Sequence, residues 1–258
     1  MLRKRIIFTL IYCDGFFMQS RNFRLQKVGD ISWLKKNYKF QNSSFSIDEL
    51  IILDASRNKK TTTSFLDDVE NLAMGSFIPI SVGGGIDSFE KCKILFERGA
   101  DKIVLNSLLV KNSELVKKIT TYYGSQSIVA SIDVRKIDKS YSVFSDNGTL
   151  IVDMNIYEYL SHIQKLGIGE VYINSIDRDG TGFGFDTSLI NFIENKIKTP
   201  IILAGGAGNY KHFMDCLSLD FINAAATANL FNFMGEGLSI VRDKLIKNGI
   251  NIAKWNNI

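Results

Sequence analysis

The sequence predicts a closed (β/α)8 barrel, the TIM barrel, formed as a single domain over residues 1–258. Short apolar runs typical of strands alternate with longer amphipathic segments typical of helices, which is the pattern of parallel βα units. The two halves of the chain also resemble one another at an offset of about 121 residues. Finally, a length of 258 residues is close to the roughly 250 residues typical of this barrel.

Eight short apolar runs are expected to form the barrel strands. They lie at residues 5–11, 48–53, 78–83, 102–106, 126–133, 170–175, 200–205 and 220–226. The segments between them carry helix signals, most clearly residues 88–99. There Ser88 stands as an N-cap, apolar residues follow at helical spacing, and Gly99 is placed to end the helix.

The internal repeat supports a closed barrel over an open sheet. The matched segments are residues 6–11 with 128–133, 49–54 with 170–175, and 78–85 with 199–206. The last pair contains the two prolines of the chain, Pro79 and Pro200. We therefore expect half-barrels at about residues 1–122 and 123–258. The alternative, a doubly wound open sheet, would not predict equivalent halves of four strands each.

Composition excludes several classes of protein. The net charge of +4 is small and spread along the chain, which disfavours a nucleic-acid partner. The three cysteines, Cys13, Cys92 and Cys216, have no CxxC spacing and lie far from His162 and His212 in the sequence. We therefore expect neither a disulfide framework nor a metal site, and a reducing, cytoplasmic location.

The N-terminus has the basic-then-apolar order of a signal peptide, but its apolar run covers only residues 6–12. Cys13 and Asp14 follow where small residues would be needed for cleavage. We interpret this run as the first barrel strand. No uncharged apolar stretch reaches about 18 residues, so no association with a membrane is expected.

Glycine-rich loops follow the third and seventh predicted strands, at residues 83–85 and 205–208. In these barrels the active site lies at the C-terminal ends of the strands, where glycine lets the backbone approach a phosphate. Either loop alone is equally consistent with a tight turn, but two equivalent loops indicate two phosphates on one elongated ligand. The predicted phosphate-binding residues are Gly84, Gly85, Asn106, Ser107, Asp179, Gly180, Gly205, Gly206 and Asn229.

Carboxylates at strand ends are the candidates for acid–base chemistry. Asp133, at the end of the fifth strand, is the predicted catalytic residue. Asp54 is interpreted as structural, either pairing with Arg57 or capping its loop. The repeat equivalent of Asp133 is Ile11, where a mechanism with two carboxylates would require an acid.

Long motifs in the same order make the chain resemble the cyclase subunit of imidazole glycerol phosphate synthase, the HisF family, over nearly its full length. They are Lys4-Arg5-Ile6-Ile7, Val82-Gly83-Gly84-Gly85-Ile86, Gly99-Ala100-Asp101-Lys102, Gly124-Ser125-Gln126, Ser175-Ile176-Asp177-Arg178-Asp179-Gly180-Thr181 and Gly205-Gly206-Ala207-Gly208. The resemblance implies a glutaminase partner on the N-terminal face of the barrel. Ammonia from that partner would cross the barrel and attack a bisphosphorylated ribulosyl intermediate.

The resemblance also implies an ammonia gate of four charged residues, matched here by Arg5, Glu49, Lys102 and Glu170. Each lies at the start of a predicted strand, so the four are expected to converge at one end of the barrel. The alternative role is stability, which is the usual meaning of residues on that face. Because unpaired buried charges are costly, a complete ring indicates a passage as well.

At the opposite end the chain departs from the family pattern. Of the two catalytic aspartates that the resemblance implies, Asp133 matches the second and Ile11 replaces the first. An isoleucine cannot transfer a proton, so cyclisation by the usual pair is not expected. The other departures are Gln19 in place of a lysine, and Asn174, Ala204 and Asn229 in place of other polar residues.

An intact gate with an altered reacting centre is similar to a second group, the cyclase-like subunits of surface-polysaccharide pathways. That resemblance implies a glutaminase-docking subunit that conducts ammonia toward a phosphorylated small molecule or a separate sugar amidotransferase, without a cofactor. Asp101 is expected to lie on the docking face. Two alternatives stay open: an authentic cyclase of histidine biosynthesis, and a non-catalytic barrel that binds a phospholigand.

Overall fold

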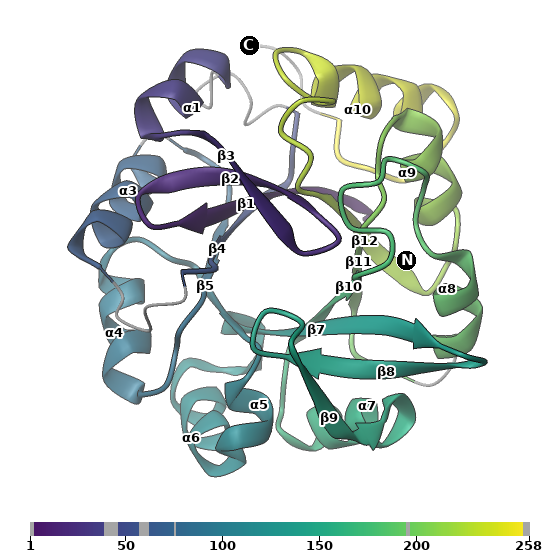
Figure 1. Cartoon of the computed structure of the whole chain (residues 1–258). Coiled ribbons are helices and arrows are strands. Elements are labelled where there is room, and N and C mark those ends of the chain that lie inside the picture. The colour runs from purple at the N-terminus through teal and green to yellow at the C-terminus, as the bar shows by residue number, and fades with distance from the viewer. Residues whose placement is uncertain (1–2, 39–45, 57–61, 75, 195–196, 255–258) are drawn as a thin grey trace.

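Eight parallel strands close into a barrel in the computed structural model, which describes residues 3–38, 46–56, 62–74, 76–194 and 197–254 (Figure 1). The strands are β1 (Arg5–Cys13), β4 (Glu49–Asp54), β5 (Ile80–Gly83), β6 (Lys102–Leu105), β7 (Ile128–Ile137), β10 (Glu170–Ser175), β11 (Ile201–Ala204) and β12 (Ile222–Thr227). Each pairs in parallel with the next, and β12 pairs with β1. The predicted (β/α)8 barrel is confirmed, and all eight predicted runs form its strands.

Helices surround the barrel, as Figure 1 shows. They are α1 (Ile31–Asn37), α3 (Thr63–Ala73), α4 (Phe89–Glu97), α5 (Leu108–Lys111), α6 (Ser113–Tyr123), α7 (Ile156–Lys165), α8 (Thr187–Ile193), α9 (Tyr210–Leu217) and α10 (Gly237–Lys247), with a short 3-10 turn at Ser125–Ser127. Helix α4 matches its prediction: the Ser88 side chain accepts from the N–H of Lys91, and Gly99 has a φ of 96°. No helix in the described ranges is long and apolar enough to cross a membrane.

Two β-hairpins were missing from the sequence prediction. One follows β1 and consists of β2 (Phe16–Arg21) and β3 (Arg24–Gly29); the other follows β7 and consists of β8 (Ser140–Ser145) and β9 (Leu150–Asn155). Both extend the first barrel strand of their half by antiparallel pairing. The Asp14-Gly15 pair between apolar runs is a typical hairpin turn and could have revealed the first one.

The tips of the two hairpins touch at the C-terminal end of the barrel. A Cβ atom added to Gly148 in the β8–β9 turn would lie 2.6 Å from the Phe23 ring in the β2–β3 turn. Asn147 in the same turn donates to the carbonyl of Ala55, which follows β4, at 3.4 Å. Segments from both halves of the chain therefore lie over the barrel mouth (Figure 1).

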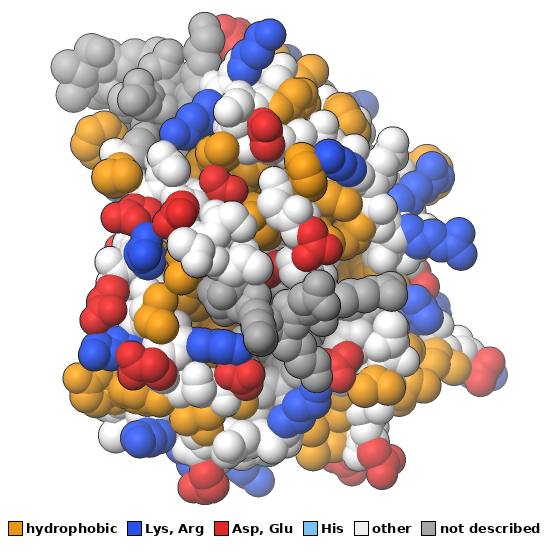
Figure 2. Space-filling model, turned by 60° about the vertical axis from the view of Figure 1, so that its left-hand side comes forward, with side chains coloured by type: hydrophobic (Ala, Val, Ile, Leu, Met, Phe, Trp, Pro, Cys, Tyr) orange, Lys and Arg blue, Asp and Glu red, His pale blue; other side chains and the backbone are white. Residues whose placement is uncertain are grey.

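Two separate apolar clusters fill the fold. The larger lies between the strands and the helices, and the smaller lies inside the barrel. The inner cluster is formed by Ile7, Ile51, Val104, Val129, Tyr172, Ile202, Ala204, Ala224 and Ala226. On the outer face drawn in Figure 2, basic and acidic side chains are intermingled over the described residues.

Candidate functional site

A closed ring of ion pairs stands at the N-terminal end of the barrel. The Arg5 guanidinium contacts Glu49 at 3.0 Å and also pairs with Glu170. The Lys102 ammonium contacts Glu49 at 2.9 Å and Glu170 at 2.7 Å. Acids and bases therefore alternate around the ring, and the structure brings the four residues together as their places at strand starts predicted.

The ring keeps its charges because each is compensated. Burial opposes the charge on Glu170, but Arg5 and Lys102 outweigh it and hold the pKa of this carboxyl below its usual range. Burial likewise opposes the charges on Arg5 and Lys102, and their acidic partners nevertheless raise both pKa values. Glu49 is almost fully buried and accepts a further hydrogen bond from the Ser81 hydroxyl.

Above the ring, a tyrosine extends across the inside of the barrel. The Tyr172 hydroxyl on β10 lies 3.4 Å from the Thr9 hydroxyl on β1, and both residues are buried. Strands β11 and β12 lie between them in the sheet and contribute the small Ala204, Ala224 and Ala226 to the inner cluster. Burial raises the pKa of Tyr172, so its hydroxyl stays neutral. Sequence analysis missed this pair, because neither residue stands at a strand end.

Tyr172 and Thr9 also line a cavity that opens at the C-terminal mouth. The same cavity is lined by Gln19, Asn174 and Asn229, three of the positions at which the chain departs from the family pattern, and by Ile11. Gly180, Gly205 and Gly206 of the predicted phosphate loops also line it, as does Asp179. Four of the five altered positions therefore share one space, and Ala204 is the exception.

Asp133 is a buried carboxylate at the mouth. It accepts a hydrogen bond from the Asn106 amide at 2.9 Å. Burial, with a smaller contribution from the charge of Asp179, raises the pKa of Asp133 to about 7 against the opposing effect of amide donors. A carboxyl that titrates near neutrality can act as a general acid or base.

Neither Asp14 nor Asp54 replaces the acid that is absent at position 11. Asp14 lies in the exposed β1–β2 turn, where its N–H donates to the Ser56 hydroxyl at 2.9 Å. Asp54 caps its own loop by accepting from the N–H of Ser56 at 2.9 Å. Its alternative partner, Arg57, lies outside the described residues.

Gln19 is engaged at both ends of its amide. Its oxygen accepts from the N–H of Leu230 at 2.9 Å, and its nitrogen donates to the carbonyl of Ser20 at 3.1 Å. The Tyr38 hydroxyl donates to the carbonyl of the same Leu230. Gln19 thus ties the first hairpin to the loop after β12.

The second glycine loop, after β11, is packed too closely for any side chain. A Cβ atom on Gly206, whose φ is 104°, would lie 2.0 Å from the carbonyl oxygen of Gly184. Gly180, with a φ of 66°, would place its Cβ atom 1.9 Å from the carbonyl oxygen of Ser20. Within the described residues, the N–H groups of Gly206 and Ala207 have no acceptor. Gly206 and Ala207 both line the cavity.

Two other predicted phosphate ligands shape the loops around this site. The Asp179 carboxylate accepts from the Ser20 hydroxyl and from the N–H of Phe23, and so holds the first hairpin. The Asn229 side-chain oxygen accepts from the N–H groups of Phe231 and Asn232. Their role as phosphate ligands stays a prediction.

The first glycine loop, after β5, has different surroundings. A Cβ atom on Gly84, whose φ is 113°, would lie 2.2 Å from the carbonyl oxygen of Asp54. The Gly85 carbonyl accepts from the Lys91 ammonium at 2.9 Å. The Ser107 hydroxyl, predicted to bind phosphate, donates instead to the Asp146 carboxylate at 3.0 Å.

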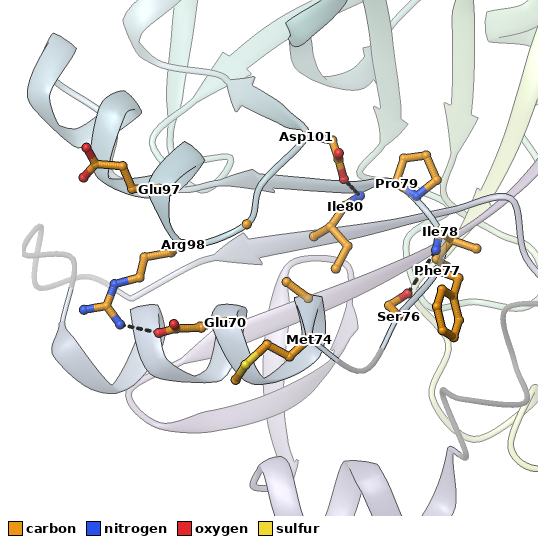
Figure 3. Close-up of a pocket in the computed structure, with 12 residues that line it drawn as sticks. Glu70, Met74, Ser76, Phe77, Ile78, Pro79, Ile80, Glu97, Arg98 and Asp101 are labelled. Carbon is orange, nitrogen blue, oxygen red and sulfur yellow. Dashed lines mark hydrogen bonds and ion pairs between the residues drawn. The ribbon is translucent and has the colours of Figure 1, made fainter.

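A wide pocket lies on the N-terminal face, at the C-terminal ends of α3 and α4 and the start of β5 (Figure 3). Its volume is about 580 Å³, and its lining includes Met74, Phe77 and Arg98. Phe77 is 93% exposed and Met74 is 76% exposed. Asp101, next to Lys102 of the ring, lines the pocket and accepts from the N–H of Ile80 at 2.8 Å.

Comparison with known proteins matches residues 19–236 to the family described as histidine biosynthesis protein. A putative imidazole glycerol phosphate synthase subunit hisF2 of Parasynechococcus marenigrum is 46% identical over 256 residues, covering 99% of this chain and 95% of that protein. The imidazole glycerol phosphate synthase subunit HisF of a Thermotoga species is 36% identical over 253 residues, with 98% of each chain covered. The subunit HisF of Chlorobium chlorochromatii is 34% identical over 252 residues, covering 98% of this chain and 99% of that protein.

Proposed function

Because the chain belongs to the histidine biosynthesis protein family, as a HisF-type subunit, we propose that it docks a glutaminase and conducts ammonia in the cytoplasm. The observation that carries the proposal is the difference between the two ends of the barrel. The four-charge ring is complete, whereas Ile11 stands in the mouth where a second acid would be needed. Entry of ammonia is retained, and the chemistry of cyclisation is not.

The ring and the inner cluster suit the passage of neutral ammonia. An ammonium ion entering the apolar interior would lose its hydration without a fixed counter-ion, which costs several kcal/mol. Neutral ammonia avoids this cost and can hydrogen-bond to the hydroxyl groups of Thr9 and Tyr172 on the way. The ring residues Arg5, Glu49, Lys102 and Glu170 would act as the gate, by opening one ion pair at a time.

The exposed pocket on the N-terminal face supports docking of a glutaminase there. Large exposed apolar side chains such as Phe77 and Met74 mark interaction sites when they gather beside a polar rim. Arg98 and Asp101 supply charges at the edge of the same pocket. A partner seated over this pocket would release ammonia next to Lys102 and the rest of the ring.

At the other end, the cavity of the mouth would receive a phosphorylated small molecule at the loop of Gly180 and Gly206. That molecule is either the ammonia acceptor itself or a regulatory ligand, in which case a separate sugar amidotransferase uses the ammonia.

A second candidate function is the authentic cyclase of histidine biosynthesis. Asp133 favours it, because its pKa of about 7 suits acid–base chemistry. Ile11 opposes it. The third candidate is a barrel that binds a phospholigand and has no glutaminase. In such a protein the closed ring would only stabilise the fold.

The docking step is tested by measuring how the purified chain stimulates glutamine hydrolysis by its cognate glutaminase. Phe77→Asp should lower the affinity of the complex by at least about tenfold, because a charge would replace an aromatic side chain that the glutaminase covers. Phe183→Asp is the matched control, since Phe183 is 74% exposed in the loop after β10, at the other end of the barrel. Wild-type protein that neither binds nor stimulates the glutaminase at micromolar concentration would refute the proposal.

A further inference from the structure

The two glycine loops differ in one respect that bears on the ligand. At the loop after β11 the N–H groups of Gly206 and Ala207 have no acceptor among the described residues, whereas near the first loop a carboxylate of the protein already sits on the polar groups. We propose that the ligand carries one phosphate group, bound at Gly206, because the Asp146 carboxylate takes the place of a second phosphate at Ser107. This inference rests on the proposed function and narrows its substrate class.

Asp146 makes the contacts expected of a bound anion. Its carboxylate accepts from the Ser107 hydroxyl at 3.0 Å and from the Lys111 ammonium at 2.9 and 3.0 Å. The N–H of Asp146 donates back to the Ser107 oxygen at 3.3 Å. A hydroxyl and an ammonium on one anionic group are the donors that a phosphate monoester would use.

The backbone holds Asp146 in this place. It opens the β8–β9 turn with a φ of 49°, followed by Asn147 at 56° and Gly148 at 73°. The carbonyl of Asp146 accepts from the Thr149 hydroxyl at 2.6 Å and from its N–H at 3.3 Å. The contact of Asn147 with Ala55 fixes the turn from its other side. The carboxylate is therefore delivered by a turn that is anchored at several points.

The Asn106 amide, which is also predicted for the first phosphate, is engaged within the protein, because it donates to Asp133. A phosphate at Ser107 would have to displace Asp146 and would then lie beside its charge. Like charges at contact distance repel, so a second phosphate is disfavoured there.

The second loop has the opposite character. Its one nearby carboxylate, Asp179, is turned to the Ser20 hydroxyl and the N–H of Phe23 on the first hairpin. The cavity extends from Gly206 to Tyr172 and Asn174, whose amide also contributes to the surroundings of Asp133. A small molecule with a single phosphate at Gly206 would therefore extend toward Tyr172 and Asn174.

The test compares wild-type protein with Asp146→Asn, which removes the charge and keeps the shape of the turn. Crystals grown in inorganic phosphate should hold phosphate at Gly206 in both proteins, and at Ser107 only in the variant. Calorimetric titration should give glycerol 3-phosphate and fructose 1,6-bisphosphate similar affinities for wild type. The Asp146→Asn variant should bind the bisphosphate at least about tenfold more tightly than wild type does, because one charge-assisted contact is added.

Asp138→Asn is the matched control, because Asp138 lies in the β7–β8 turn with a φ of 53° and is exposed. This variant should behave as wild type. Phosphate at Ser107 in the wild-type crystal would overturn the inference, and so would an Asp146→Asn variant without the added site or the gain in affinity. The glutaminase assay uses no phosphate ligand, so the proposed function and this inference can fail separately.

Discussion

Both ends of the barrel bury carboxylates, but the pKa of the carboxyl is lowered at one end and raised at the other. Glu170 in the ring has a lowered pKa, because Arg5 and Lys102 compensate its charge. Asp133 in the mouth has neutral amide partners, and its pKa rises to about 7. Burial is common to both, so the presence of an opposite charge decides the ionisation state.

This difference separates the roles of the two ends. A ring of compensated charges stays ionised at neutral pH and can serve as the entrance. A carboxylate that titrates near neutrality is available for proton transfer, but Ile11, which lines the cavity of the mouth, cannot act as an acidic partner. Three predictions probe this contrast, beginning with the largest effect.

The first prediction concerns the mouth. With saturating ammonium salt, which bypasses any glutaminase, the protein should convert the bisphosphorylated ribulosyl substrate about 10² to 10⁴ times more slowly than an authentic cyclase. Ile11→Asp alone should not restore the rate, because Gln19, Asn174 and Asn229 have also altered the cavity. Product formation measured against an authentic cyclase provides the test. Comparable turnover in wild type would eliminate the ammonia-conducting role and establish the cyclase alternative.

The second prediction concerns the ring. Glu49→Gln should lower the free energy of unfolding by about 3–5 kcal/mol, because Arg5 and Lys102 would be left with one acid between them. Urea denaturation measures the change. Glu97→Gln is the control, since Glu97 forms an exposed pair with Lys93 on α4, and its loss should have little effect. Equal effects of the two variants would contradict the account of the ring as a buried, mutually compensated unit.

The third prediction compares the pH dependence of the two ends. Because folding raises the pKa of Asp133 to about 7, the folded state favours the protonated carboxyl. The resulting stabilisation is complete below about pH 4 and is lost as the pH rises through 7. Relative to Asp133→Asn, wild type should therefore lose roughly 2–3 kcal/mol of stability between pH 5 and pH 8.

Glu170 shows the opposite linkage. Its folded pKa is lowered, so its stabilisation is present at neutral pH and is lost only as the pH falls through that low pKa. Glu170→Gln should therefore shift stability by a constant amount between pH 5 and pH 8. Denaturation series at several pH values would show both patterns, and a pH-independent difference between wild type and Asp133→Asn would contradict the raised pKa.

The sequence alone determined the eight barrel strands, the ring and the two glycine loops. Strands follow from short apolar runs, and the ring follows because Arg5, Glu49, Lys102 and Glu170 each open such a run. In a parallel barrel all strand starts lie at the same end, so sequence position translates directly into place. The half-barrel repeat was predicted from matched segments of the sequence, and these segments occupy equivalent positions in the barrel.

Only the tertiary structure decided what each loop residue touches. Ser107 meets Asp146, Gln19 meets Leu230, and Tyr172 meets Thr9. These partners lie 39, 211 and 163 residues apart in the sequence. They come together through hairpin turns and through the curvature of the closed sheet, which no local pattern encodes. A serine beside a glycine loop is therefore read as a phosphate ligand from sequence, until the fold places a carboxylate of the protein against it.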